Sequence, residues 1–70
     1  MNNVISESSY YIFMNDGDKM YLLGRTGQYE TELSKAITFT DKLDAIIYVE
    51  KHGLERIATI RKVVPAVNKL

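Results

Sequence analysis

The chain has 70 residues, of which 46% are hydrophobic and 26% are charged, with 9 basic and 9 acidic side chains and a formal net charge of zero. These values are typical of one small folded domain with a modest core, and they exclude a long disordered chain. The balanced charge removes the electrostatic argument for binding nucleic acid or a membrane surface. The lack of cysteine excludes disulfides and thiol chemistry.

Neither end of the sequence carries a segment typical of secretion or membrane insertion. Residues 1–9 are rich in Ser and Asn and lack the basic start and apolar run of a secretory signal. No stretch approaches the roughly 18 apolar residues of a transmembrane helix. The sequence therefore predicts a cytoplasmic protein without membrane contact. We expect residues 1–9 to be a flexible lead, residues 10–64 a single domain, and residues 65–70 a tail that begins at a proline.

A β-hairpin is predicted over residues 10–23. The runs 10–14 and 20–23 are apolar at every position, and Asp16-Gly17 lies in the segment between them. Asp-Gly between two strand-like runs favours a tight turn, because both residues tolerate the positive φ that such a turn needs. Gly24 ends the second predicted strand.

The segment between the hairpin and the next strong pattern is predicted to be mostly irregular. Residues 24–31 have turn composition and no periodicity. Residues 31–36 could form a single helical turn capped by Thr31. Residues 37–39 are expected to be a short extended link.

A helix is predicted over residues 41–52. Asp41 can accept amide hydrogens of the first turn, and Asp44 occupies the position of the return partner in a capping box. Gly53 is placed to stop the helix in the left-handed conformation, with Leu54 folding back onto Val49. The broad apolar stripe of this helix consists of Leu43, Ala45, Ile46, Ile47, Tyr48 and Val49.

Residues 55–64 form the last predicted strand. Alternation places Ala58 and Ile60 on one of its faces and Thr59 and Val63 on the other. The element order is therefore β-β-α-β. Pairing the first strand with both of the others gives an α+β fold, a three-stranded antiparallel sheet in the order 2-1-3 with one helix on one face.

Both strands of the predicted hairpin are apolar on both faces, although one helix can cover only one face of a sheet. The second face would expose roughly a few hundred Å² of apolar surface, which in a monomer usually marks an interface. This predicts a protein partner or self-association as a homo-oligomer. The residues expected to bind the partner are Tyr11, Phe13, Tyr21, Leu23 and Tyr29. The alternative is that the amphipathic tyrosines tolerate water and the chain's own tail folds over this face.

One segment, Gly24-Arg25-Thr26-Gly27, has the composition of an anion-binding loop. Two glycines let backbone amides converge, and the Arg25 guanidinium and Thr26 hydroxyl add donors. The ligand would be a phosphate or a nucleotide. The lysine and the spacing of a Walker loop are missing. A flexible connection is the alternative, since most glycine-rich loops only turn the chain.

The sequence contains no recognisable catalytic or metal-binding constellation. His52 is the only histidine, and its place at the end of the predicted helix is explained by the helix dipole. Asp16 and Asp18 lack the closing Glu of a calcium loop, and no G-x-S-x-G motif is present. We therefore predict that the protein is not an enzyme and uses no metal or cofactor. The missing basic surplus disfavours base stacking on exposed aromatics as a mode of nucleic-acid binding.

The sequence, most clearly over residues 31–45, is similar to a pattern in many small bacteriophage and prophage proteins. That pattern has a Thr, a Lys-Ala pair, a Phe, a capped helix with Ala and Tyr, and Gly-Leu before a closing strand. The matching residues are Thr31, Lys35, Ala36, Phe39, Ala45, Tyr48, Gly53 and Leu54. The likeness covers roughly residues 10–64 and departs from the pattern at Leu43, where those proteins often carry a charge.

This resemblance implies a small phage-type accessory protein that acts in the cytoplasm of a host bacterium. Such proteins often contact a host protein, as an inhibitor or against a defence system. The alternatives are a homo-oligomer that sequesters an anionic metabolite or nucleotide signal, and a structural accessory protein.

Overall fold

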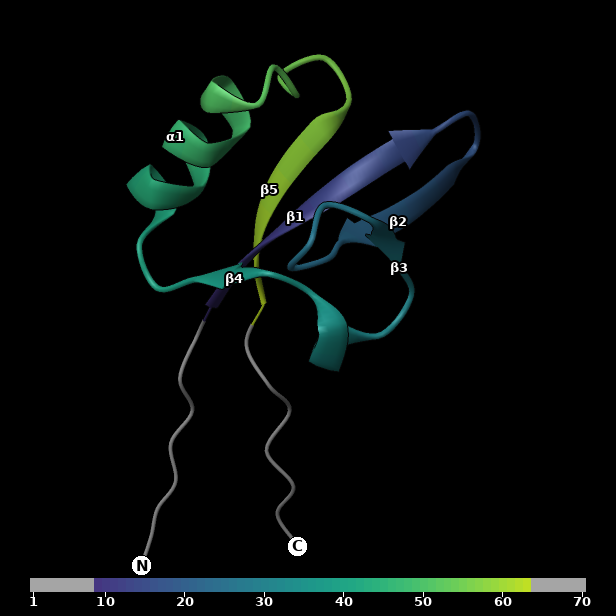
Figure 1. Ribbon diagram of the computed structural model, residues 1–70, viewed down its shortest axis with the longest axis horizontal. Coiled ribbons are helices and arrows are strands. Elements are labelled where there is room, and N and C mark those ends of the chain that lie inside the picture. Colours follow the sequence, from purple (N-terminus) through teal and green to yellow (C-terminus); the bar gives the residue numbers. More distant parts are fainter. Residues whose placement is uncertain (1–8, 64–70) are drawn as a thin grey trace, which may run out of the picture.

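The computed structural model describes residues 9–63, which form one α-helix packed on an antiparallel sheet (Figure 1). The α+β class with a single helix agrees with the prediction. The sheet has five strands, however, where three were expected. In chain order the elements are β1 (Ser9–Asp16), β2 (Lys19–Leu23), β3 (Tyr29–Glu30), the 3₁₀ turn η1 (Leu33–Lys35), β4 (Thr38–Phe39), α1 (Lys42–Lys51) and β5 (Ala58–Val63).

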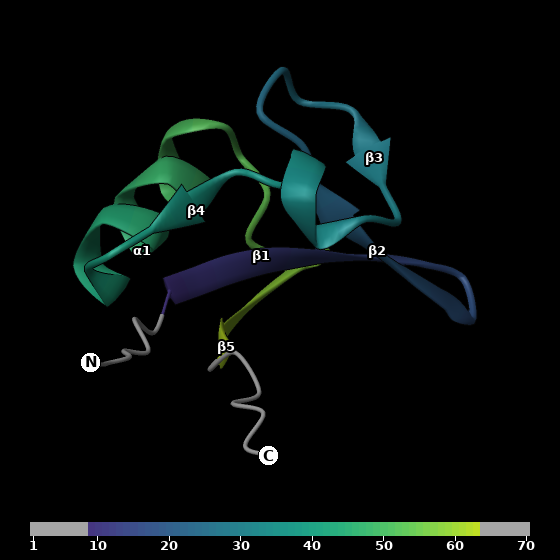
Figure 2. The same ribbon diagram turned by 90° about the horizontal axis from the view of Figure 1, so that it is seen from below.

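The long strand β1 is the centre of the sheet and pairs with three others. Along one edge, β5 pairs with residues 9–14 of β1. Two strands share the opposite edge of β1, because β4 pairs with residues 10–11 and β2 pairs with residues 13–16. β3 extends the sheet beyond β2, and Figure 2 shows it on the far side of β2 from β1. The predicted order 2-1-3 is therefore present as β2-β1-β5, with β3 and β4 added.

The two added strands lie where the sequence predicts a loop and a link. Residues 29–30 fall within the predicted irregular segment and pair with the end of β2. Residues 38–39 were expected to be a link and instead pair with Tyr10 and Tyr11. Each strand is two residues long. An alternation of apolar and polar residues cannot be recognised over so short a run, so only tertiary pairing defines these strands.

The predicted hairpin is confirmed, with its turn shifted by one residue. Asp16 pairs with Lys19, so the two-residue loop is Gly17-Asp18 rather than Asp16-Gly17. Gly17 has a φ of 67°, and no non-glycine residue among residues 9–63 has a positive φ. A positive φ at the first central residue alone is what a type II′ turn requires.

The predicted helix is confirmed to within one residue at each end. Its stop forms as expected: Gly53 has a φ of 65° and its N–H donates to the Glu50 carbonyl at 3.2 Å, while the Leu54 N–H donates to the Val49 carbonyl at 2.9 Å. This pair of bonds is a Schellman motif, which satisfies two of the last carbonyls of the helix. The predicted capping box is wrong, because the Asp41 side chain makes no capping hydrogen bond.

Two other predicted boundaries differ from the structure. The helical turn expected over 31–36 is the shorter 3₁₀ turn η1, whose N-cap is Glu32 rather than Thr31 and makes no side-chain cap bond. The last strand begins at Ala58, because residues 55–57 form a turn instead. Residue 64, the predicted end of that strand, lies outside the described residues.

The core lies between α1 and the sheet. Ile12 and Met14 of β1 are almost completely buried, at 0% and 1% exposed. Ile12 pairs with Ile60 and Met14 with Ala58, so the two buried side chains of β1 share a face with Ala58 and Ile60, which the alternation places together. The buried cluster is Ile12, Met14, Leu23 and Val49, packed against Ile37, Phe39, Tyr48, Leu54, Ala58 and Ile60. Within residues 9–63, no helix has the length and hydrophobicity needed to span a bilayer.

Candidate functional site

The five residues predicted to bind a partner do not share one surface. Tyr11 and Phe13 lie on the face of β1 opposite α1, since the side chains that alternate with them point into the core. Leu23 belongs to the core and is 3% exposed, so it is not available on an outer surface. Tyr21 and Tyr29 lie on the same side of the sheet as Leu23, where their rings are 5.4 Å apart.

The sheet face opposite the helix is less exposed than the sequence predicts. Tyr11 and Phe13 are each half-buried. Leu22 lies on the same face, because it pairs with Phe13, and is only 6% exposed. Met20, at the end of the hairpin, is the strongly exposed apolar side chain that this face contributes among residues 9–63. This face therefore offers partly covered aromatic rings rather than a broad uncovered patch.

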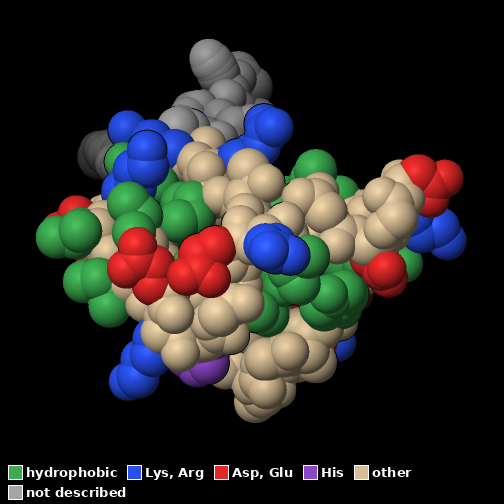
Figure 3. Space-filling model, turned by 90° about the horizontal axis from the view of Figure 1, so that it is seen from above, with side chains coloured by type: hydrophobic (Ala, Val, Ile, Leu, Met, Phe, Trp, Pro, Cys, Tyr) green, Lys and Arg blue, Asp and Glu red, His purple; other side chains and the backbone are tan. Residues whose placement is uncertain are grey.

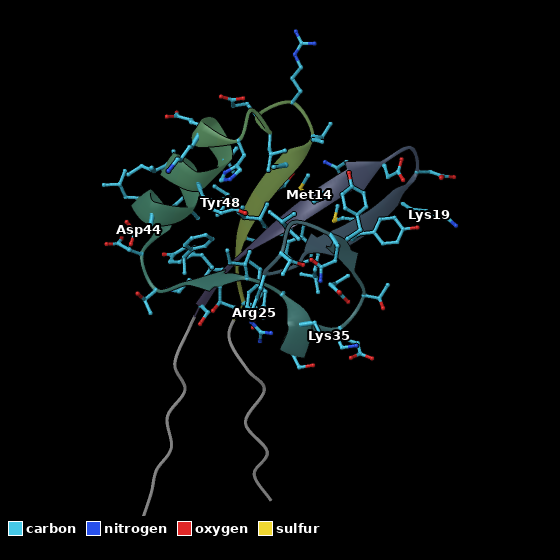
Figure 4. All side chains as sticks on the ribbon, in the orientation of Figure 1. Met14, Lys19, Arg25, Lys35, Asp44 and Tyr48 are labelled. Carbon is cyan, nitrogen blue, oxygen red and sulfur yellow. The ribbon has the colours of Figure 1, made fainter. Side chains whose placement is uncertain are left out.

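An apolar groove lies on the other side of the sheet, between the end of α1 and the loop that joins β2 to β3. Its volume is about 250 Å³. Met14 and Leu23 are buried in its floor, whereas Tyr29 and Ile57 are 43% and 38% exposed at its rim. Figure 4 shows Met14 on β1 and Tyr48 on α1, both in the space between the helix and the sheet. We call this site the helix–loop groove, and its lining consists of Met14, Leu23, Gly27, Tyr29, Tyr48, His52, Leu54 and Ile57.

Aromatic contacts fix the helix side of the groove. The ring of Tyr48 lies 5.6 Å from that of Phe39 and 4.1 Å from that of His52, on which it stacks with an interplanar angle of 25°. His52 is the C-cap of α1, and its Nδ1 lies 3.0 Å from the Tyr48 carbonyl oxygen. A carbonyl can only accept, so Nδ1 carries the hydrogen of this bond. This contact agrees with the predicted role of His52 at the helix end.

The hydrogen bond of Nδ1 determines what the other nitrogen of His52 can do. In a neutral imidazole with Nδ1 protonated, Nε2 is an acceptor. No described residue makes a hydrogen bond to Nε2 of His52. His52 therefore adds a polar ring to a lining that is mostly apolar and aromatic.

The predicted anion-binding loop is closed by hydrogen bonds within the chain. The Gln28 side-chain oxygen accepts from the Thr26 N–H at 3.1 Å and from the Thr26 hydroxyl, and its Nε2 donates to Glu30 at 2.7 Å. The Gly24 N–H donates to the Gln28 carbonyl at 2.7 Å. Gln28 thus occupies donors that an anion would use, the two of Thr26 through its carboxamide and the Gly24 N–H through its main-chain carbonyl.

Two further groups of the predicted loop also make hydrogen bonds within the chain. Arg25 donates from Nη2 to the Ser34 carbonyl at 2.6 Å, which ties the loop to η1. The Gly27 N–H donates to the Gly24 carbonyl at 3.1 Å. In Figure 4 the Arg25 side chain lies beside β4 and η1 rather than near Tyr48. Arg25 therefore lies apart from the groove.

Gly24 and Gln28 are expected to be energetically coupled. A Cβ at Gly24 would lie 2.7 Å from the Gln28 carboxamide carbon, so Gly24→Ala must push that side chain out of its hydrogen bonds. We expect Gly24→Ala to lower the free energy of unfolding by about 1 kcal/mol. We expect Gln28→Ala to cost less in the Gly24→Ala background than alone. Urea denaturation of the single and double variants measures this coupling, and strictly additive costs would contradict it.

The charged side chains of the described region give no sign of a catalytic or metal centre. Among residues 9–63, no group of three or more His, Asp and Glu side chains is placed to hold a metal ion. The ion pair found there joins Lys35 to Glu32 at 3.9 Å, and both side chains are exposed. None of the groove residues is an Asp, Glu, Lys or Arg. The groove is therefore suited to an uncharged, apolar occupant.

The exposed apolar residues are dispersed over the molecule. Figure 3 shows hydrophobic side chains in separate groups, with charged and polar ones between them. The strongly exposed ones among residues 9–63 are Met20, Tyr29, Leu33, Leu43, Ile47 and Ile57. Tyr29 and Ile57 differ from the others in that both line the groove.

No protein-family model matches the chain, and no curated protein or solved structure matches it either. The resemblance to small phage proteins thus stays a prediction from the sequence.

Proposed function

We propose that this protein is a small non-enzymatic binding protein of phage type that takes an apolar side chain of a host protein into the helix–loop groove. The observation that supports this is an open apolar hollow directly above the core, with Met14 at its floor and Tyr29 and Ile57 at its rim. The residues that dominate protein interfaces are large side chains inserted into such well-packed hollows.

The size and lining of the groove favour one side chain over a nucleotide. Sites for drug-sized ligands have volumes of roughly 300–1,000 Å³, and the groove is smaller, at about 250 Å³. A nucleotide would also need cationic side chains to bind its phosphate groups, and none of the groove residues is a lysine or an arginine. Sequestration of an anionic metabolite or nucleotide is therefore the weaker alternative.

The test compares two charge-introducing variants at half-exposed isoleucines. Ile57 lines the groove, and its backbone bonds to Asn15 and Leu54 do not involve its side chain. Ile47 is 51% exposed on α1 and does not line the groove, so it is the matched control. We expect the wild type and Ile47→Asp to capture the same protein from host lysate, and Ile57→Asp to bind it at least 10-fold more weakly. An aspartate at the rim would have to be desolvated against an apolar partner.

If Ile47→Asp weakened the capture and Ile57→Asp did not, the partner would bind the helix, which contradicts the proposal. Failure to capture any specific protein from several hosts would also contradict it. The competing possibility is that a second copy of this chain occupies the groove. Sedimentation of the wild type beside Ile57→Asp distinguishes it, because only self-association predicts an oligomer that the substitution dissociates.

A further inference from the structure

The outer edge of β5 has no partner strand among residues 9–63. β5 pairs with β1 alone, and Figure 2 shows it on the side of β1 that is turned away from β4. A free strand edge presents a row of backbone N–H and C=O groups to which another strand can bond. An extended segment of a partner protein is often recognised by its addition to such an edge.

The register of β1 and β5 determines which backbone groups of β5 face outward. Asn15 and Ile57 are opposite each other when this register is continued, and the Asn15 N–H donates to the Ile57 carbonyl at 2.8 Å. Because backbone groups point alternately to the two sides of a strand, the even-numbered residues of β5 direct theirs away from β1. The Ala58 N–H already donates within the preceding turn. The N–H and C=O groups of Ile60 and Lys62 therefore remain for an added strand.

The side chains along this edge are basic. Arg61 and Lys62 are exposed, β5 contains no Asp or Glu, and neither cation makes an ion pair within residues 9–63. Alternation places Lys62 on the same face as Ile60 and Arg61 on the other face. A second copy of β5 would bring two more cations and no carboxylate to the same ladder, which disfavours self-pairing. A strand with two neighbouring carboxylates would instead meet an opposite charge on each face.

We infer that the outer edge of β5 binds an extended acidic segment of a partner protein as an added antiparallel strand. Its carboxylates lie opposite Arg61 and Lys62, and an apolar side chain lies opposite Ile60. Antiparallel pairing is the more stable kind and is the one used throughout this sheet. Main-chain hydrogen bonds provide the affinity, and the two cations select the acidic sequence. No residue of β5 lines the helix–loop groove, so this surface is separate from the one proposed above.

The test titrates the full-length protein with the peptide acetyl-Thr-Glu-Glu-Val-Thr-Val-amide and follows it by NMR. In an antiparallel register its two glutamates lie opposite Lys62 and Arg61, and its first valine lies opposite Ile60. We expect the amide signals of Ile60 and Lys62 to shift, with a dissociation constant on the order of a millimolar for so small a ligand. The same peptide with lysine in place of both glutamates should bind about 10-fold more weakly, because like charges then oppose each other.

Methylation of the peptide backbone separates strand addition from simple charge attraction. A methyl group on the nitrogen of the first valine removes the N–H that would donate to the Ile60 carbonyl, so we expect it to abolish binding. A methyl group on the nitrogen of the second glutamate lies on the side turned away from β5. This peptide keeps the same charge and should bind within about 3-fold of the parent.

Two substitutions of Lys62 separate its charge from its backbone donor. Lys62→Gln removes the charge alone and should weaken binding of the acidic peptide about 3-fold. Lys62→Pro also removes the outward N–H, which β1 does not use, and should weaken binding about 10-fold or more. The matched control is Arg56→Gln, which removes an exposed cation from the turn before β5 and should leave binding unchanged.

Several results would overturn the inference. Equal binding of the two methylated peptides would mean that no strand is added, and equal binding of the acidic and lysine peptides would mean that the cations select nothing. A dimer that Lys62→Pro dissociates in sedimentation would assign the edge to a second copy of this chain. If the acidic peptide does not bind at tens of millimolar, the inference fails. The function proposed for the groove would then still stand or fall on Ile57→Asp.

Discussion

Replacing Ile12 by alanine is expected to lower the free energy of unfolding by about 2–5 kcal/mol. Ile12 is 0% exposed and lies at the centre of the buried cluster, so the removed atoms leave a cavity that the neighbouring strands cannot fill. A domain of 70 residues has a total stability of only about 4–10 kcal/mol. Urea denaturation followed by circular dichroism should therefore show a much lower midpoint, or a chain unfolded without denaturant.

Ile47→Ala is the matched control for this prediction. It makes the same chemical change at a side chain that is 51% exposed on α1. We expect its effect to stay within about 0.5 kcal/mol, since alanine also has the better helix propensity. Equal losses at Ile12 and Ile47 would mean that the core does not lie between the helix and the sheet.

A second large effect is expected at Leu22, on the opposite face of the sheet. Leu22 and Leu23 are neighbours in β2, point to opposite faces, and are 6% and 3% exposed. We expect Leu22→Ala to cost about 2–4 kcal/mol, nearly as much as Leu23→Ala. Leu43→Ala removes the same atoms from a side chain that is 59% exposed and should cost far less. Thermal and urea unfolding of the three variants measures the order.

This comparison also tests how the face opposite the helix is covered. A cost at Leu22 as small as that at Leu43 would mean that this face is open to water. The wide association surface predicted from the two-sided apolar hairpin would then regain support. A cost close to that at Leu23 means that neighbouring side chains such as Phe13 already provide cover.

The parts of the fold that the sequence predicts correctly depend on local chemistry. The hairpin follows from a glycine between two apolar runs, and Gly17 does adopt a positive φ. The end of α1 follows from Gly53 and Leu54, because a left-handed residue and an apolar one after it complete a Schellman motif. Both signals are contained within a few residues, and no distant contact is needed to recognise them.

The parts that the sequence does not reveal depend on pairing between distant residues. β3 and β4 exist because Tyr29 reaches β2 and Phe39 reaches β1. The burial of Leu22 likewise depends on the register with Phe13. A strand that is apolar at every position carries no information about which face is covered.

The candidate site likewise depends on contacts between distant residues that the sequence does not reveal. Sequence reasoning included Leu23 and Tyr29, and the structure brings them together with Tyr48 and His52. The sequence predicts His52 only as a helix-end residue, and the structure adds its stack on Tyr48 and its place in the groove lining. The signal that was available is the Tyr48–His52 spacing of four residues, which places two rings on one side of a helix.

The position of β1 between its partners also has a consequence for how the protein is made. β1 is synthesised before its longest partner, β5, which ends at Val63, and Val63 pairs with Ser9. The apolar side chains of β1 must therefore stay without their final neighbours until nearly all of the domain has been translated. The hairpin can form early, yet cooperative closure of the sheet waits for the last strand. The pairing of β1 with β5 should consequently be a late step in folding, because it joins residues that are far apart in the sequence.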